Sequence, residues 1–170
     1  MSITRSVIAA LITAVILAAG SAAYAQSTKA VKTFRDWTLY SHTGDPGDIC
    51  FATSQPRETK PADVERDRAY FYISSWVKDG IRNQTSVLLG YDIDDQSTIK
   101  ITIGGRSFEM FTKDGKGFVS DATEELKLID AMKRGNFMTV TAETKDGTET
   151  SDTYSLLGAT AAVNALSNGC

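Results

Sequence analysis

The sequence has few of the residues on which catalytic and metal sites depend. Its 170 residues include one histidine, His42, and two cysteines, Cys50 and Cys170. A Ser-His-Asp hydrolase would have to use His42, yet the sequence contains no Gly-x-Ser-x-Gly turn that would present a nucleophilic serine. One histidine and two cysteines that can pair with each other are too few ligands for a zinc site. We therefore predict no catalytic residue, no metal site and no cofactor.

Other chemical signatures are also missing. Asp92, Asp94 and Asp95 form an acidic cluster, but the glycine and glutamate of an EF-hand calcium loop do not follow at the required positions. No Walker or dinucleotide-binding glycine pattern occurs. Two carboxylates would suffice for a glycosidase, and nothing selects a pair among the 21 acidic residues. A protein without enzymatic activity is therefore the main hypothesis, and an unrecognised hydrolase stays open as an alternative.

Excess positive charge and long apolar runs are absent from most of the chain. The formal net charge is -3 at pH 7, from 18 lysines and arginines against 21 acidic residues. A mildly acidic chain lacks the basic surface that binds nucleic acid or anionic lipid, so we expect no nucleic-acid partner. After the N-terminal segment, no apolar run is long enough to span a membrane, which predicts no integral membrane segment.

The N-terminal segment has the three parts of a secretory signal. Arg5 provides the positive start, residues 7–19 are almost entirely apolar or small, and an Ala-Tyr-Ala sequence ends at residue 25. The apolar run is shorter than the roughly 20 residues that a membrane-spanning helix needs. We therefore predict a signal peptide at residues 1–25 and one exported domain at residues 26–170. This domain would be periplasmic, or exported and loosely associated with the outer membrane.

Export would place the two cysteines where disulfides form. Two cysteines allow only one intramolecular bond, between Cys50 and Cys170. Closing a loop of about 120 residues would stabilise the fold by roughly 4–5 kcal/mol in the chain-entropy model. We predict this disulfide; two free thiols and an intermolecular bond are the alternatives.

Short alternating segments separated by turn sequences predict a mostly β domain. Gly-Gly at 104–105 and Asp-Gly at 114–115 and 146–147 are typical of tight hairpin turns. Residues 26–32 are predicted to be a flexible lead-in, and residues 55–68, with two prolines and many charges, an exposed loop. The predicted strands span residues 37–42, 49–54, 70–77, 86–91, 98–103, 107–112, 138–142 and 150–156.

Two helices are predicted among the strands. Residues 121–134 begin with acidic and end with basic side chains, and Gly135 follows, as helix dipoles and caps favour. Within this helix, Leu126, Ile129 and Met132 are expected to face the core. A second helix is predicted from apolar residues at helical spacing: Ala159, Ala162, Val163 and Leu166. The expected fold is an antiparallel β-sandwich or strongly bent sheet of about seven to nine strands with two short helices.

The aromatic residues offer the one candidate binding surface. Tyr70, Tyr72 and Trp76 share one face of the strand at 70–77, because side chains alternate along a strand. Large residues on both faces are typical of a central strand that is packed on both sides. The alternative is a surface for a small ligand, such as a sugar, lipid or peptide, formed by Trp37, Tyr70, Tyr72 and Trp76.

Several sequence segments, in order, resemble the invasion-associated locus B family of exported bacterial proteins. They are FRDWTLY at 34–40, CFATSQP at 50–56, RN at 82–83, FEMFT at 108–112, AMKRG at 131–135, TYSLLG at 153–158 and the terminal Cys170. The resemblance implies an exported envelope protein, and the family's name links it to host-cell entry without defining a biochemical activity. The resemblance supplies no catalytic residues. From the export signal, the predicted disulfide-closed β domain and the missing catalytic residues, we expect the protein to act by binding an envelope component or a host protein.

Overall fold

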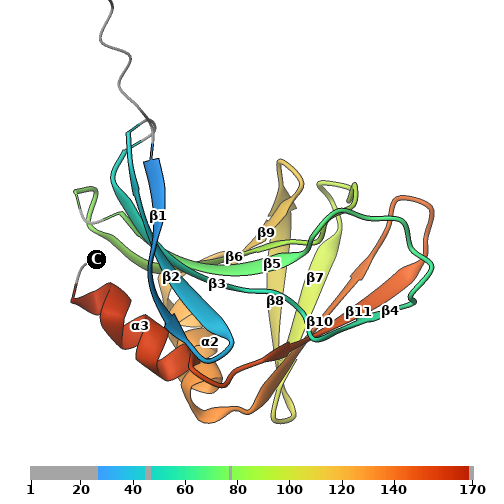
Figure 1. Cartoon of the computed structure of the whole chain (residues 1–170). Helices are drawn as coiled ribbons and strands as arrows, with labels where there is room; N and C mark the ends of the chain where they lie inside the picture. Colours follow the sequence, from blue (N-terminus) through green and yellow to red (C-terminus); the bar gives the residue numbers. More distant parts are fainter. Residues whose placement is uncertain (1–26, 45–46, 77, 169–170) are drawn as a thin grey trace, which may run out of the picture.

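The computed structural model describes residues 27–44, 47–76 and 78–168. Within them, 11 strands form one sheet in the order β1-β2-β3-β5-β6-β9-β8-β7-β10-β11-β4, with every neighbouring pair antiparallel (Figure 1). The strands are β1 (Ser27–Phe34), β2 (Trp37–Thr43), β3 (Ile49–Ser54), β4 (Glu58–Lys60), β5 (Tyr70–Trp76), β6 (Ile81–Leu88), β7 (Thr98–Ile103), β8 (Arg106–Lys113), β9 (Lys116–Phe118), β10 (Phe137–Glu143) and β11 (Glu149–Ser155). The helices are α2 (Ala122–Arg134) and α3 (Ala159–Ser167). The predicted mostly β fold with a bent antiparallel sheet and two helices is confirmed.

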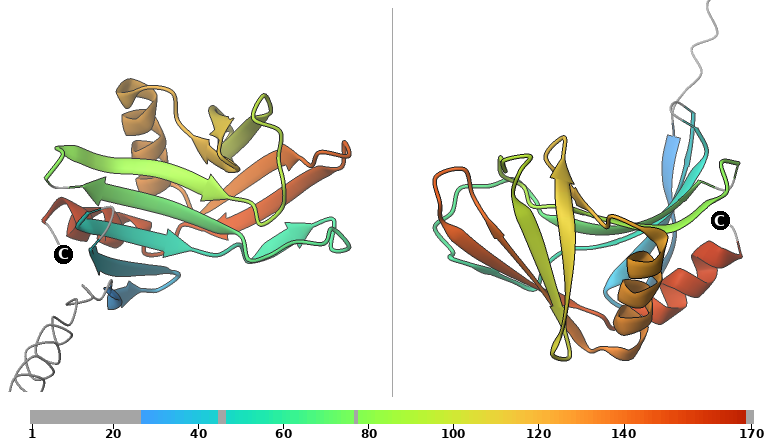
Figure 2. Two further views of the ribbon diagram at one scale, coloured as in Figure 1. Left: turned by 90° about the horizontal axis from the view of Figure 1, so that it is seen from above. Right: turned by 180° about the vertical axis from the view of Figure 1, so that it is seen from behind.

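The sheet bends so strongly that strands far apart in its order meet across the core. The indole N–H of Trp37 on β2 donates to the carbonyl oxygen of Ser155 on β11 at 3.0 Å. Only three residues after β3, the backbone N–H of Arg57 donates to the carbonyl oxygen of Thr153 on β11 at 2.7 Å, and the chain then continues into β4 beside β11. Helices α2 and α3 contact each other and lie on the same side of the sheet (Figure 2). The core is therefore enclosed by one curled sheet and two helices.

Alternation along the strands explains which side chains form this core. On β7, Ile99, Ile101 and Ile103 are buried while the residues between them face outward, as the sequence pattern predicted. Helix α3 buries its predicted apolar face completely: Ala159, Ala162, Val163 and Leu166.

The predicted core face of α2 is partly wrong. Leu126 is 68% exposed, whereas Leu128 and Ile129 are buried together with Met132. Residues 128, 129 and 132 fall within about 100° of one another on a helix with 3.6 residues per turn, and residue 126 lies about 110° from the middle of that group. The helix bounds themselves are confirmed, because the Asp121 side chain caps the first turn by accepting hydrogen bonds from two backbone N–H groups.

The strand count exceeds the predicted seven to nine because short and edge strands lack a clear pattern. The predicted flexible lead-in is wrong from Ser27 onward, since β1 pairs with β2 and exposes most of its residues as an edge strand. The predicted loop at 55–68 contains β4, which pairs with β11 at the other edge. The predicted strand at 86–91 begins earlier, at Ile81. Strand β9 has only three residues and occupies the centre of the sheet.

Two predictions involve residues outside the described ranges. The signal peptide at 1–25 lies outside them entirely, and so does Cys170, the predicted disulfide partner of Cys50. Cys50 itself is buried on β3, and α3 packs against that strand. Both assignments stay predictions. In the described part of the chain, neither helix has the length and apolar character needed to cross a membrane.

Candidate ligand-binding surface

The face of the sheet that points away from the core carries three of the four predicted surface aromatics. Tyr70, Tyr72 and Trp76 are half-buried on the outer face of β5, while Phe71 between them is buried in the core. Trp37 lies on the opposite, core side and is 0% exposed. Its indole N–H is bonded to a backbone carbonyl and its ring packs edge-on against Phe71 at 6.3 Å. Trp37 is therefore a core residue and does not belong to the surface that the sequence predicted.

Neighbouring strands extend the row of outer aromatics. Tyr40 on β2 stacks on Phe51 of β3 with a centroid distance of 5.2 Å, and Phe51 contacts Tyr72 at 6.0 Å. Tyr70 and Tyr72 follow at 5.8 Å. Burial, with a smaller contribution from the neighbouring tyrosines, raises the pKa of Tyr72. Its hydroxyl therefore stays neutral at physiological pH and can both donate and accept hydrogen bonds.

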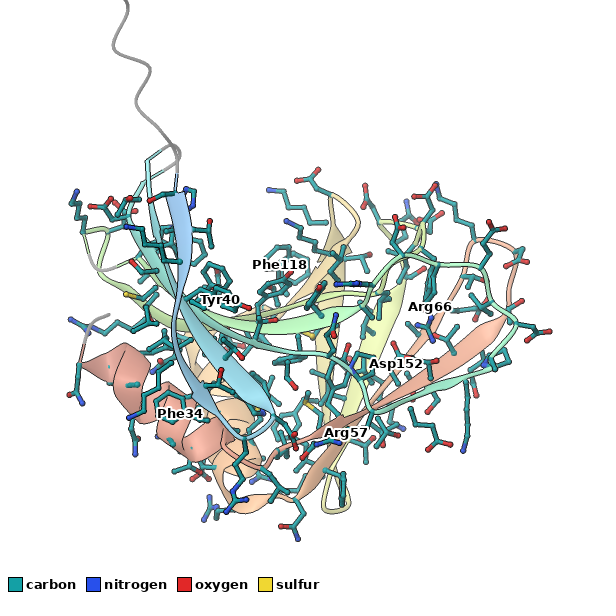
Figure 3. The ribbon with its side chains drawn as sticks, in the orientation of Figure 1. Phe34, Tyr40, Arg57, Arg66, Phe118 and Asp152 are labelled. Atoms are coloured by element: carbon teal, nitrogen blue, oxygen red, sulfur yellow. The ribbon has the colours of Figure 1, made fainter. Side chains whose placement is uncertain are left out.

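The row continues beyond the small side chain of Ser86 on β6. Ser86 pairs with Tyr72 on one side and with Phe118 of β9 on the other. Phe118 in turn lies opposite Phe111 of β8, with 6.0 Å between ring centroids. Figure 3 shows Tyr40 and Phe118 above the ribbons of β5 and β6. We call this row of rings the outer aromatic face; its members are Tyr40, Phe51, Tyr70, Tyr72, Phe111 and Phe118. Trp76 lies on the same side of the sheet at the far end of β5 and is not counted as a member.

Sequence reasoning missed four of these six residues, although a usable signal was present. In the strand at 37–42, Tyr40 alternates with the apolar Leu39, and in the strand at 49–54 Phe51 alternates with Cys50. The alternation shows that two faces exist. It does not show that the outer faces of neighbouring strands line up, because that depends on strand order and register.

A groove of about 550 Å³ opens at one end of the outer aromatic face. It forms where β2 begins, β3 ends and β5 begins; these three strand ends lie together because neighbouring strands run antiparallel. Alternate residues line it from the segments at 36–40 and 68–70, and five consecutive residues line it from the segment at 53–57. We call it the strand-end groove; it is lined by Asp36, Thr38, Tyr40, Thr53, Ser54, Gln55, Pro56, Arg57, Arg68 and Tyr70.

Two arginines give the strand-end groove an excess of positive charge. The Asp36 carboxylate forms an ion pair with Arg57. A hydrogen bond from the Ser155 hydroxyl, together with Arg57, holds the pKa of Asp36 below its usual value, so this carboxylate stays ionised. Arg68 is exposed and has no ion-pair partner among the residues that the structure describes. One positive charge is thus left over in the groove.

A second polar cluster lies inside the fold. The Arg66 guanidinium donates two hydrogen bonds to the Asp152 carboxylate, at 2.8 and 2.9 Å, and packs 5.7 Å from the ring of Tyr91 (Figure 3). The Tyr91 and Thr150 hydroxyls share a hydrogen bond of 2.6 Å. Burial outweighs the attraction of Arg66 and raises the pKa of Asp152. This pair ties the 55–68 segment to β11, and both partners are occupied with each other, so we assign it a structural role.

Two other positions singled out in the sequence, His42 and Asp94, have hydrogen-bond partners. The Nδ1 atom of His42 is hydrogen-bonded to the Thr28 hydroxyl of β1 at 2.8 Å. Asp94 accepts a hydrogen bond from the backbone N–H of Gln96 and so stabilises its own turn. Among the described residues, no group of three or more histidines, cysteines and carboxylates is placed to hold a metal ion.

Together these features define a mostly β domain built on one bent antiparallel sheet, with an aromatic face opposite its core. The sequence model for the Invasion associated locus B (IalB) protein matches residues 37–167, and the chain therefore belongs to the IalB family. The resemblance noted in the sequence is thereby confirmed. The matched segment contains every strand of the outer aromatic face, and β1 precedes it. No curated protein and no solved structure matches the chain significantly.

Proposed function

We propose that this IalB-family protein is a non-enzymatic, exported protein of the cell envelope that binds another macromolecule through its outer aromatic face. The observation that carries the proposal is the placement of six aromatic side chains on the face opposite the core. They come from β2, β3, β5, β9 and β8, with β6 between β5 and β9. Aromatic side chains are enriched in the buried centres of protein interfaces, where their large area is removed from water.

These aromatics are not needed to close the core. Both helices contribute their buried residues to the core cluster on the other side of the sheet, where Phe71 and Ile73 of β5 also lie. Among the described residues, no helix therefore covers the outer aromatic face. The exposed Phe111, with 46% of its surface accessible, is the member that a partner would bury most.

The partner is an envelope component or a host protein, met in the periplasm or at the outer membrane after export. The predicted signal peptide and the family's link to host-cell entry support this setting. The proposal needs no catalytic group, and the single histidine is engaged with β1.

Crosslinking with affinity capture in intact cells tests the proposal directly. Phe111→Ser and Tyr40→Ser remove two members of the face, and Phe137→Ser is the matched control because Phe137 is 58% exposed on β10, outside this face. We expect the wild type and Phe137→Ser to capture the same partner and the two test variants to lose it, while circular dichroism shows all four proteins folded at the assay temperature. Equal capture by all four proteins would show that the face is not the binding surface.

A further inference from the structure

We propose that the strand-end groove is a binding site for a saccharide that carries a carboxylate. The inference deepens the proposed function, because the groove is one end of the outer aromatic face and Tyr40 and Tyr70 belong to both. In the bound state, Arg57 and Arg68 would hold the carboxylate, and the rings of Tyr40 and Tyr70 would pack against the C–H faces of the sugar.

The charge of the groove favours an anion. Arg57 and Arg68 are the basic residues of its lining and Asp36 is the single acidic one. Asp36 is already engaged by Arg57, and a guanidinium has five N–H donors, so Arg57 keeps donors for a ligand. Planar guanidinium groups match carboxylates in two-point hydrogen bonds. This local excess of positive charge stands out in a chain with a net charge of -3.

The backbone that carries both arginines is anchored. The Arg57 N–H is hydrogen-bonded to Thr153 of β11 at 2.7 Å. The residue before Arg68, Asp67, donates its backbone N–H to the Gly90 carbonyl oxygen at 2.7 Å. Two guanidiniums on fixed segments lose less conformational freedom when a ligand binds than they would on a free loop.

The lining favours a sugar over an apolar ligand. Of its ten residues, only Pro56 has no polar side-chain atom; the others offer hydroxyl, amide, guanidinium or carboxylate groups. Tyr40 and Tyr70 add apolar ring faces whose neighbours hold them in place, Phe51 at 5.2 Å and Tyr72 at 5.8 Å. A sugar ring has the same combination of hydroxyl edges and C–H faces. The volume, about 550 Å³, is within the range of small-ligand sites.

Calorimetric titration of the purified exported protein tests this assignment with defined probes. The acidic probes are a tetramer of galacturonic acid and sialyllactose, and the neutral probe is maltotetraose. We expect at least one acidic probe to bind and the neutral probe to bind at least about tenfold more weakly, with affinity falling as salt rises. Absence of binding by both acidic probes, or equal binding of the neutral tetramer, would overturn the assignment.

Two arginine variants locate the site. Arg68→Gln should weaken binding by about tenfold or more, because it removes one charge-assisted contact. Arg82→Gln is the matched control, because it also removes an exposed arginine. Arg82 follows Ile81, which pairs with Trp76 at the end of β5 that is distant from the groove. Unchanged affinity in Arg68→Gln would overturn the assignment. If tetraglutamate binds more tightly than either acidic sugar, and this binding depends on Arg68, the saccharide assignment is overturned in favour of an acidic peptide.

The Phe111→Ser variant separates this inference from the proposed function. Phe111 does not line the groove, so the variant should bind the acidic sugar normally while it loses the macromolecular partner. If the sugars fail to bind while partner capture still depends on Phe111, the saccharide assignment is wrong and the proposed function stands. If sugar binding depends on Arg68 while partner capture is unchanged by Phe111→Ser and Tyr40→Ser, the groove is confirmed as a saccharide site. The outer aromatic face is then not the surface that binds the macromolecular partner.

Discussion

Replacing Arg66 with methionine should destabilise the protein strongly, because it leaves the Asp152 carboxylate buried without its partner. The Arg66 and Asp152 side chains are only 9% and 1% exposed. Both carboxylate oxygens accept hydrogen bonds from the guanidinium, at 2.8 and 2.9 Å. Methionine is long enough to fill part of the space but offers no donor.

The expected magnitude follows from this burial. Removing one member of a buried ion pair costs about 3–5 kcal/mol, out of roughly 5–15 kcal/mol for a whole domain. At roughly 3 °C per kcal/mol for a domain of this size, the melting temperature should fall by roughly 10–15 °C. The double variant Arg66→Met with Asp152→Leu should recover most of this loss, since an apolar pair leaves no buried charge.

The loss should also depend on pH. Burial already raises the pKa of Asp152 in the wild type, and loss of the guanidinium raises it further. A carboxyl whose folded-state pKa lies above its unfolded-state value stabilises the fold below the unfolded pKa, and this stability is lost as pH rises through the folded pKa. The cost of Arg66→Met should therefore be full near neutral pH and smaller near pH ~4.

Thermal unfolding followed by circular dichroism at both pH values measures these effects. Arg68→Met is the matched control, because Arg68 lies two residues further along the same segment and is exposed. A melting temperature for Arg66→Met equal to that of Arg68→Met would refute the claim that Arg66 is structurally important. A cost that stayed constant between the two pH values would refute the account based on the Asp152 carboxylate.

Three further predictions use the same unfolding assay. Gly158→Ala should destabilise the fold by about 3 kcal/mol or more. Gly158 has φ +97°, and an added Cβ would lie 1.8 Å from the Phe34 carbonyl oxygen. A melting temperature equal to that of the wild type would contradict this. Glu125 accepts hydrogen bonds from Thr85, and burial raises its pKa. The protonated carboxyl therefore stabilises the fold at low pH, and this stability is lost as pH rises through the raised pKa. Glu125→Gln should thus be at least as stable as wild type at neutral pH and lose that advantage in acid; a deficit at neutral pH would count against this. Reductant should lower stability by roughly 4 kcal/mol if Cys50 is bridged as predicted, whereas an unchanged melting temperature would argue for thiols.

Local patterns were enough to predict most of the elements. The strict alternation of Ile99, Ile101 and Ile103 defined both the strand and its buried face, because only one face of this segment is apolar. Asp121 and Gly135 marked the ends of α2, because caps act through neighbouring backbone groups. The same local logic placed Tyr70, Tyr72 and Trp76 on one face of β5.

Residues whose role depends on distant neighbours were assigned wrongly. The alternation at 37–42 left open which face meets the core, and the structure buries Trp37 through its contact with Ser155, 118 residues along the chain. Arg66 is charged and follows two prolines, which predicts an exposed loop, yet β11 supplies a buried carboxylate opposite it. Edge strand β1 mixes polar and apolar residues on both faces, so its pairing with β2 leaves no pattern in its sequence.

The sequence alone determined the β class of the chain and the residues that share a face within each strand, because these depend on composition and on contacts between near neighbours; export stays a prediction. Only the tertiary structure decided that the outer faces of β2, β3, β5, β8 and β9 join into one aromatic surface. It also decided that three strand ends meet in a groove with two arginines. Strand order and register set both features, and register is fixed when the curled sheet buries its core against two helices.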